Sequence, residues 1–112
     1  MSLIYAYQNR GLTKDFTIDD INGDAITPGM NDKLRISIGR LGEIAKLIFT
    51  SDAATANGSS VTRGASNRLR LDAADLALID PGTYTLVVDY YDNADAQEWK
   101  TVSRQVFVLE ET

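Results

Sequence analysis

The chain has 112 residues, with 11 Lys and Arg against 16 Asp and Glu, and it contains neither cysteine nor histidine. These absences exclude disulfides and thiolate zinc sites and remove the commonest general base, so we expect no enzyme, no catalytic residue and no cofactor. The length suits a single domain over residues 1–112. No apolar run approaches the roughly 20 residues of a membrane-spanning helix, so we expect no membrane partner.

Short stretches of alternating apolar and polar residues run through the first half of the chain and predict β-strands. The Asn22-Gly23 pair predicts a tight turn between two of them, because both residues accept positive φ. The stretch over 33–39 alternates most clearly, and it places Leu34, Ile36 and Ile38 inward. We expect strands over 3–8, 12–19, 25–27, 33–39 and 43–50, with 1–11 as an extended arm or edge strand and a short helix as the alternative over 43–50.

The second half continues the pattern after a loop over 51–60, which is rich in small polar residues and is expected to be the most mobile segment. Helical spacing over 73–79 predicts a single helical turn, with Asp75 near its start. A change of phase near Arg104 to Phe107 predicts a β-bulge in the last strand. We expect strands over 61–63, 67–72, 83–91 and 99–109, with an acidic hairpin loop over 92–97.

The segment Asp80-Pro81-Gly82-Thr83-Tyr84 has the pattern of a tyrosine corner, in which an acid, a glycine and a tyrosine at alternate positions open an apolar strand. In immunoglobulin-type sandwiches the hydroxyl of this tyrosine bonds to the backbone a few residues upstream. We therefore expect Tyr84 to be buried and bonded to backbone within 71–79. With the strand pattern, this predicts an all-β fold, an antiparallel immunoglobulin-like β-sandwich of seven to nine short strands with one helical turn near 73–79.

Charge is unevenly distributed along the chain. Residues 33–70 carry seven bases against two acids, a net charge of +5, and residues 71–98 carry seven acids and no base, a net charge of −7. An immunoglobulin order of strands would place four bases on the outer face of one sheet: Lys33, Arg35, Arg68 and Arg70. We expect this face to contact an acidic surface of a neighbouring subunit, such as Asp89, Asp92 and Asp95 on the other sheet. Nucleic acid is a less favoured partner, because the chain is acidic and no aromatic is interleaved on that face.

Two further groups of side chains are candidates for binding. The acidic hairpin offers possible calcium ligands, although a solvated loop is the favoured interpretation: Asp89, Asp92, Asp95 and Glu98. Tyr91 and Trp99 are candidates for contact with a protein or a sugar, whereas Tyr90 is expected in the core.

Two pieces of the chain resemble phage and prophage virion domains with immunoglobulin-like folds, including the N-terminal domain of baseplate upper proteins. The early piece runs from Phe16-Thr17-Ile18-Asp19 through Asn22-Gly23-Asp24-Ala25-Ile26-Thr27, and the late piece runs from Leu69-Arg70-Leu71 through Pro81-Gly82-Thr83-Tyr84 to the Asp92 to Glu98 hairpin.

The resemblance implies a non-enzymatic building block of a virion, assembled in the host cytoplasm, in a baseplate, neck, tail or capsid decoration. Its partners would be other virion proteins or further copies of itself. The alternative is a carbohydrate-binding or adhesion module of immunoglobulin-like fold that uses Trp99, Tyr91 and nearby loops.

Overall fold

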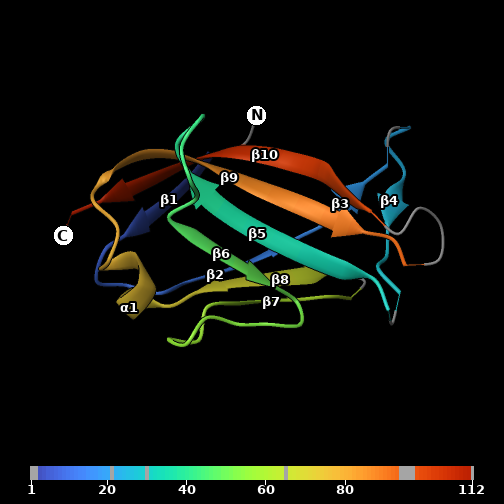
Figure 1. Cartoon of the computed structure of the whole chain (residues 1–112), viewed down its shortest axis with the longest axis horizontal. Coiled ribbons are helices and arrows are strands. Elements are labelled where there is room, and N and C mark those ends of the chain that lie inside the picture. The colour runs from blue at the N-terminus through green and yellow to red at the C-terminus, as the bar shows by residue number, and fades with distance from the viewer. Residues whose placement is uncertain (1–2, 21, 30, 65, 94–97, 112) are drawn as a thin grey trace.

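The computed structural model describes residues 3–20, 22–29, 31–64, 66–93 and 98–111, and this part of the chain is all-β (Figure 1). It contains ten strands and one short helix. The strands are β1 (Leu3–Tyr7), β2 (Leu12–Phe16), β3 (Ile18–Asp19), β4 (Ala25–Ile26), β5 (Lys33–Gly39), β6 (Leu47–Thr50), β7 (Ser60–Thr62), β8 (Asn67–Leu71), β9 (Gly82–Tyr91) and β10 (Trp99–Glu110), and the helix is α1 (Ala73–Leu76).

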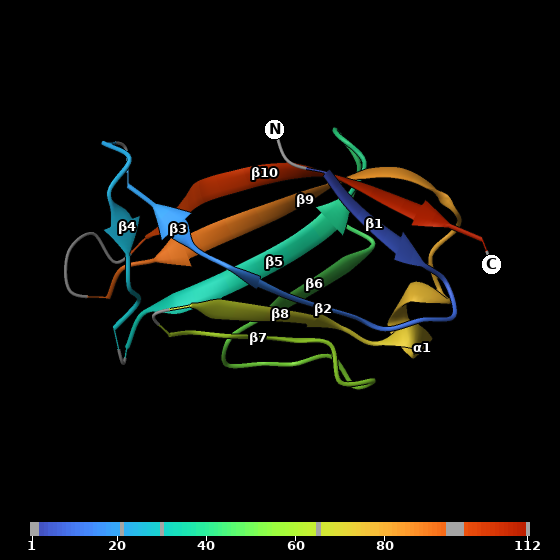
Figure 2. The same ribbon diagram turned by 180° about the vertical axis from the view of Figure 1, so that it is seen from behind.

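The strands form two larger sheets and a separate hairpin. The first sheet has five strands in the order β1-β10-β9-β5-β6, and its neighbours are antiparallel except that β1 runs parallel to β10. The second sheet has the order β2-β8-β7 and is antiparallel throughout. The β3–β4 hairpin lies at one end of the molecule and α1 at the other (Figures 1 and 2).

Side chains from both sheets pack into one apolar core. The predicted inward residues of β5, Leu34, Ile36 and Ile38, are fully buried, which confirms the alternation expected for this strand. They share the core cluster with Leu69 of β8 and Phe107 of β10. Because every second residue of a strand points to the same face, the opposite residues of β5 are directed away from the core.

The helix is shorter than the predicted turn over 73–79 and ends at Leu76. Asp72 caps it, since its side chain accepts a hydrogen bond of 2.9 Å from the Ala74 amide. Within the described residues, no helix has the length and apolar character needed to cross a membrane.

Three strand predictions need correction. The expected strand over 12–19 is divided into β2 and β3, and the expected strand over 43–50 begins only at Leu47. The bulge in β10 lies between Thr101 and Ser103 and not near Arg104 to Phe107. The outward turn of the chain at residues 40–46 explains the late start of β6, because Leu41 and Ile44 are almost fully exposed there.

The tyrosine corner joins α1 to β9. Tyr84 is 2% exposed, and its hydroxyl donates a hydrogen bond of 2.6 Å to the Asp80 carbonyl. The predicted burial is confirmed, but the acceptor, Asp80, lies just after the predicted segment 71–79. Gly82 begins β9 with a φ of 157°, a conformation that other residues rarely adopt.

Candidate interaction surface

The exposed face of the five-stranded sheet carries a group of five side chains, which we call the outer-face cluster. Strand pairing brings them together, because β5 and β10 both flank β9. Arg35 is the β5 partner of Asp89, and Tyr91 is flanked by Lys33 on β5 and Trp99 on β10. The cluster therefore consists of Lys33, Arg35, Asp89, Tyr91 and Trp99.

Ionic and aromatic contacts connect the members of the outer-face cluster. Arg35 donates two hydrogen bonds to Asp89 Oδ2, from Nε at 3.1 Å and from Nη2 at 3.0 Å. The Arg35 guanidinium also lies 4.4 Å from the centre of the Trp99 ring. Tyr91 contacts Trp99 with ring centres 5.5 Å apart, and Lys33 Nζ lies 5.6 Å from the centre of the Tyr91 ring. These contacts link the two aromatic rings to the charged side chains of β5.

The central ion pair of the cluster is partly withdrawn from water. The side chain of Asp89 is 10% exposed and that of Arg35 is 31% exposed. Thr101 satisfies the other carboxylate oxygen of Asp89 with a hydrogen bond of 2.7 Å. Both carboxylate oxygens of Asp89 therefore have hydrogen-bond partners, and the cluster combines polar and aromatic side chains on one surface.

The predicted basic face is wrong in its composition. Lys33 and Arg35 lie on β5 in the five-stranded sheet, whereas Arg68 and Arg70 lie on β8 in the three-stranded sheet. Each of the four bases has an acid of this same chain within 4 Å, at Asp52, Asp89, Asp15 and Asp72 respectively. Summing charge over sequence segments missed the Arg35–Asp89 pair, because it is formed by the pairing of β5 with β9. Asp89 therefore lies in the same sheet as Lys33 and Arg35 and not, as we expected, in the other sheet.

The Arg68–Asp15 pair is the most regular of the exposed pairs. Arg68 Nε donates to Asp15 Oδ1 at 2.8 Å across β8 and β2. The hydrogen bond from Arg68 lowers the pKa of Asp15 and raises the pKa of Arg68. Both side chains are more than half exposed, so water and salt screen the pair.

The predicted calcium ligands do not come together in the described part of the chain. Asp89 is bonded to Arg35 and Thr101, Glu98 is exposed, and Asp95 lies outside the described residues. Asp92 lines a surface hollow of about 580 Å³ beside Asp20 and Lys100. Among the residues that the structure describes, no three acidic side chains are grouped as metal ligands would be.

A buried carboxylate near this hollow, Asp32, was not predicted. It accepts hydrogen bonds from the Tyr90 hydroxyl at 2.7 Å, the Gly29 amide at 2.7 Å and the Asn93 amide at 3.0 Å. Burial raises the pKa of Asp32, but these hydrogen bonds outweigh it and hold the pKa below its ordinary value. Burial and the bond to Asp32 raise the pKa of Tyr90, which is buried as predicted.

A second buried carboxylate, Asp75, fastens the loop over 51–60. It accepts hydrogen bonds from Thr55 Oγ1 at 2.5 Å, from Asn57 Nδ2 at 2.9 Å and from the Ser59 hydroxyl. Burial raises the pKa of Asp75, and the bonds from Ser59, Thr55 and Asn57 more than compensate, so the pKa is lowered. Ser59, although it lies in the loop that we expected to be the most mobile segment, is fully buried.

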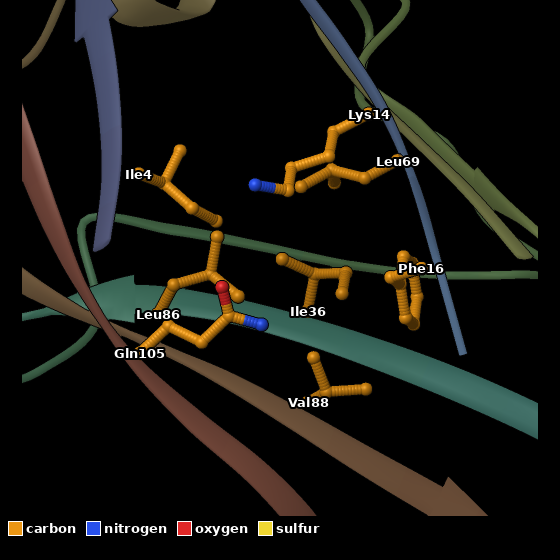
Figure 3. Close-up of a pocket in the computed structure, with 8 residues that line it drawn as sticks. All are labelled: Ile4, Lys14, Phe16, Ile36, Leu69, Leu86, Val88 and Gln105. Carbon is orange, nitrogen blue, oxygen red and sulfur yellow. The ribbon is translucent and has the colours of Figure 1, made fainter. Parts of the chain in front are cut away.

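A small cavity lies between the two sheets, and it offers no space for a ligand. It has a volume of about 10 Å³, about enough for one water molecule. Figure 3 shows the Lys14 and Gln105 side chains ending among apolar neighbours that include Ile4, Ile36 and Leu86. A hollow with more room, the one lined by Asp92, lies at the surface.

Neither protein-family models nor curated protein sequences match this chain. Any function must therefore be inferred from the fold and from the outer-face cluster.

Proposed function

We propose that this chain is a non-enzymatic structural domain of a phage particle, with an immunoglobulin-like β-sandwich fold, that acts through protein–protein contacts. The strand order supports the fold. In immunoglobulin-type sandwiches, strands B, E and D share one sheet and C, F and G share the other, to which variable-type domains add C′. The same order results if β2, β8 and β7 are B, E and D, and β5, β6, β9 and β10 are C, C′, F and G. The corner at Tyr84 then falls at the start of F, its usual place.

The outer-face cluster is the observation that carries the proposed contact function. Trp, Tyr and Arg are the residues most often found at the energetic centres of protein interfaces. Here one residue of each type gathers on the outer face of the sheet, and Asp89 accepts a hydrogen bond from Arg35. A preorganised surface of this kind loses little side-chain entropy when a partner covers it.

The proposed virion role extends this contact function to assembly with neighbouring particle proteins. The two pieces of sequence that resemble virion domains correspond to the β3–β4 hairpin and to the run from β8 to the start of β10. The lack of histidine and cysteine in the whole chain is in keeping with a structural role, because it leaves only carboxylates as candidate bases near neutral pH.

Sugar binding by the same surface is the less favoured function. A sugar ring stacks on the flat face of an aromatic side chain. The Arg35 guanidinium already covers one face of Trp99, at 4.4 Å from the ring centre. A glycan array with purified protein distinguishes the two functions, since we expect no glycan to bind.

Particle incorporation tests the proposed function. Phage particles are produced in host cells that carry the gene for this chain, separated on a density gradient and probed with an antibody against the chain. We expect the chain to sediment with the particles, and the Trp99→Ala variant to be incorporated less. The matched control is Arg68→Ala, which removes an exposed side chain from the other sheet and should be incorporated normally. A chain that stays at the top of the gradient contradicts the virion role.

A further inference from the structure

The exposed apolar side chains gather at the two edges of the five-stranded sheet. Seven large apolar side chains are exposed among the described residues, and six of them lie on an edge strand or in the loop before it. They are Leu3, Tyr5 and Tyr7 on β1, and Leu41, Ile44 and Ile48 on or before β6. β1 and β6 are the two edge strands of this sheet, at its opposite ends (Figures 1 and 2).

We propose that the β1 edge of one copy pairs with the β6 edge of a second copy of this chain, so that the five-stranded sheet continues from one subunit into the next. This inference rests on the proposed assembly function and names its partner. Contact between two different edges is heterologous, and repeated contacts of this kind build rings or filaments.

Strand direction permits this pairing. Within the sheet, β1 and β5 point the same way, and β6 is antiparallel to β5. A second copy in the same orientation therefore brings its β6 antiparallel to β1. An edge strand without charge or proline is a template for such pairing, and β1 has the sequence Leu-Ile-Tyr-Ala-Tyr.

The backbone groups at the two edges also match. The Gln8 amide donates to the Glu110 carbonyl at 3.1 Å. Because the backbone groups of successive residues in a strand point to opposite edges, every second residue counted back from Gln8 faces β10, and the backbone of Tyr5 faces the free edge. The Ser51 amide donates to the Leu34 carbonyl at 2.8 Å, so the backbone of Ile48 faces the free edge of β6. Tyr5 and Ile48 both direct their side chains outward, and they can form one hydrogen-bonded pair.

The neighbouring residues set the register of this pair. Hydrogen bonds between Thr50 and Ala53 close one end of the β6 edge, so pairing centres on Ile48. The pair also ends on its other side, because the Tyr7 carbonyl accepts from the Arg10 amide and the Lys46 amide donates to the Ile38 carbonyl. Beyond that end, Lys46 of the second copy comes near Glu110, the partner of Tyr7 on β10. Within the described residues Lys46 and Glu110 form no ion pair, and their charges are opposite. Charge and apolar surface thus fit together in the same arrangement.

Single-cysteine variants test the pairing, because the natural chain contains no cysteine. Opposite Cα atoms in an antiparallel pair lie about 4.5–5.5 Å apart, within the range of a disulfide. Under mild oxidation, we expect mixed Tyr5→Cys and Ile48→Cys chains to give mainly dimers that contain one of each. Thr83→Cys is the control, because Thr83 is exposed on the central strand β9. The proposal is overturned if the mixture of Tyr5→Cys and Ile48→Cys gives no more mixed dimers than a mixture in which Thr83→Cys replaces one of them. It is also overturned if Tyr5→Cys without the other variant forms dimers equally well.

Sedimentation at increasing concentration gives an independent result. Tyr5 and Ile48 are 53% and 56% exposed, so Tyr5→Lys and Ile48→Lys should leave folding intact. We expect the natural chain to form assemblies larger than dimers, and either variant alone to stay monomeric. An equal mixture should form dimers and nothing larger, because the Tyr5→Lys chain keeps an unchanged β6 edge and the Ile48→Lys chain keeps an unchanged β1 edge. A natural chain that stays monomeric throughout, or a mixture that stays monomeric, overturns the pairing. Loss of this pairing alone, with normal particle incorporation, leaves the proposed virion function standing.

Discussion

The Ser59 hydroxyl donates a hydrogen bond to the buried carboxylate of Asp75 and accepts one of 2.8 Å from the Asp72 amide. It thereby joins the loop over 51–60 to the start of α1. Ser59 is fully buried, so no substrate can reach its hydroxyl, and this pairing of serine with an acid is structural.

Asp75→Asn is expected to lower the free energy of unfolding by about 2 kcal/mol, because an amide nitrogen would replace one acceptor that faces the hydroxyl and amide donors of the loop. Chemical denaturation measures this change. Asp24→Asn is the control, since Asp24 is exposed, and it should leave the midpoint unchanged. Equal midpoints for the two variants would show that the loop is not held by Asp75.

Stability should fall in acid because of Asp32 and Asp75. The pKa of each is lowered in the folded state, so each carboxyl binds its proton less readily when folded than when unfolded. Their contribution is complete above the ordinary pKa of 3.8, and it is lost as the pH falls below 3.8 through the lowered folded pKa. We expect denaturation midpoints to drop in this range, and to drop less in an Asp32→Asn variant. A midpoint that stays constant through this range contradicts the prediction.

Tyr84→Phe is expected to destabilise the fold by about 1 kcal/mol, because it removes the hydrogen bond to the Asp80 carbonyl and leaves that acceptor without its partner. Thermal unfolding of the two proteins measures the loss. The comparison is Tyr5→Phe, which removes a hydroxyl from a side chain that is 53% exposed and should have no effect. If both variants unfold with the natural midpoint, the corner bond contributes nothing.

A double-mutant cycle on Arg35 and Asp89 should give a coupling energy of about 1–2 kcal/mol, because the pair is partly buried and joined by two hydrogen bonds. The same cycle on Arg68 and Asp15 should give no measurable coupling, since that pair is exposed and screened. Equal coupling in the two cycles would mean that the outer-face cluster is not preorganised.

The sequence predicted the strand framework because period-two alternation and turn residues act locally. β5 follows its predicted bounds, and Tyr84 is buried as its motif predicts. The prediction failed where long-range pairing decides the result. Segment charges could not reveal that Arg35 lies beside Asp89, which is 54 residues away along the chain.

The buried carboxylates were missed for a related reason. Aspartate is usually exposed, and most of the partners that satisfy the buried carboxylates of Asp32 and Asp75 are distant in the sequence. A weak signal existed in the loop, since Thr55, Asn57 and Ser59 alternate like residues that share a face. The candidates Tyr91 and Trp99 were placed together by the β9–β10 register, which their types alone could not predict.

Hydroxyl-radical footprinting of the chain, free and within purified particles, tests the central claim that the outer-face cluster is the contact surface. Trp99 is the single tryptophan and Tyr91 is its neighbour, so oxidation of both can be followed by mass spectrometry. Leu78 serves as the internal control, because it is 80% exposed and lies just after α1, outside the five-stranded sheet. We expect assembly to protect Trp99 and Tyr91 and to leave Leu78 as reactive as before. Protection of Leu78 with unchanged oxidation of Trp99 and Tyr91 would contradict the account.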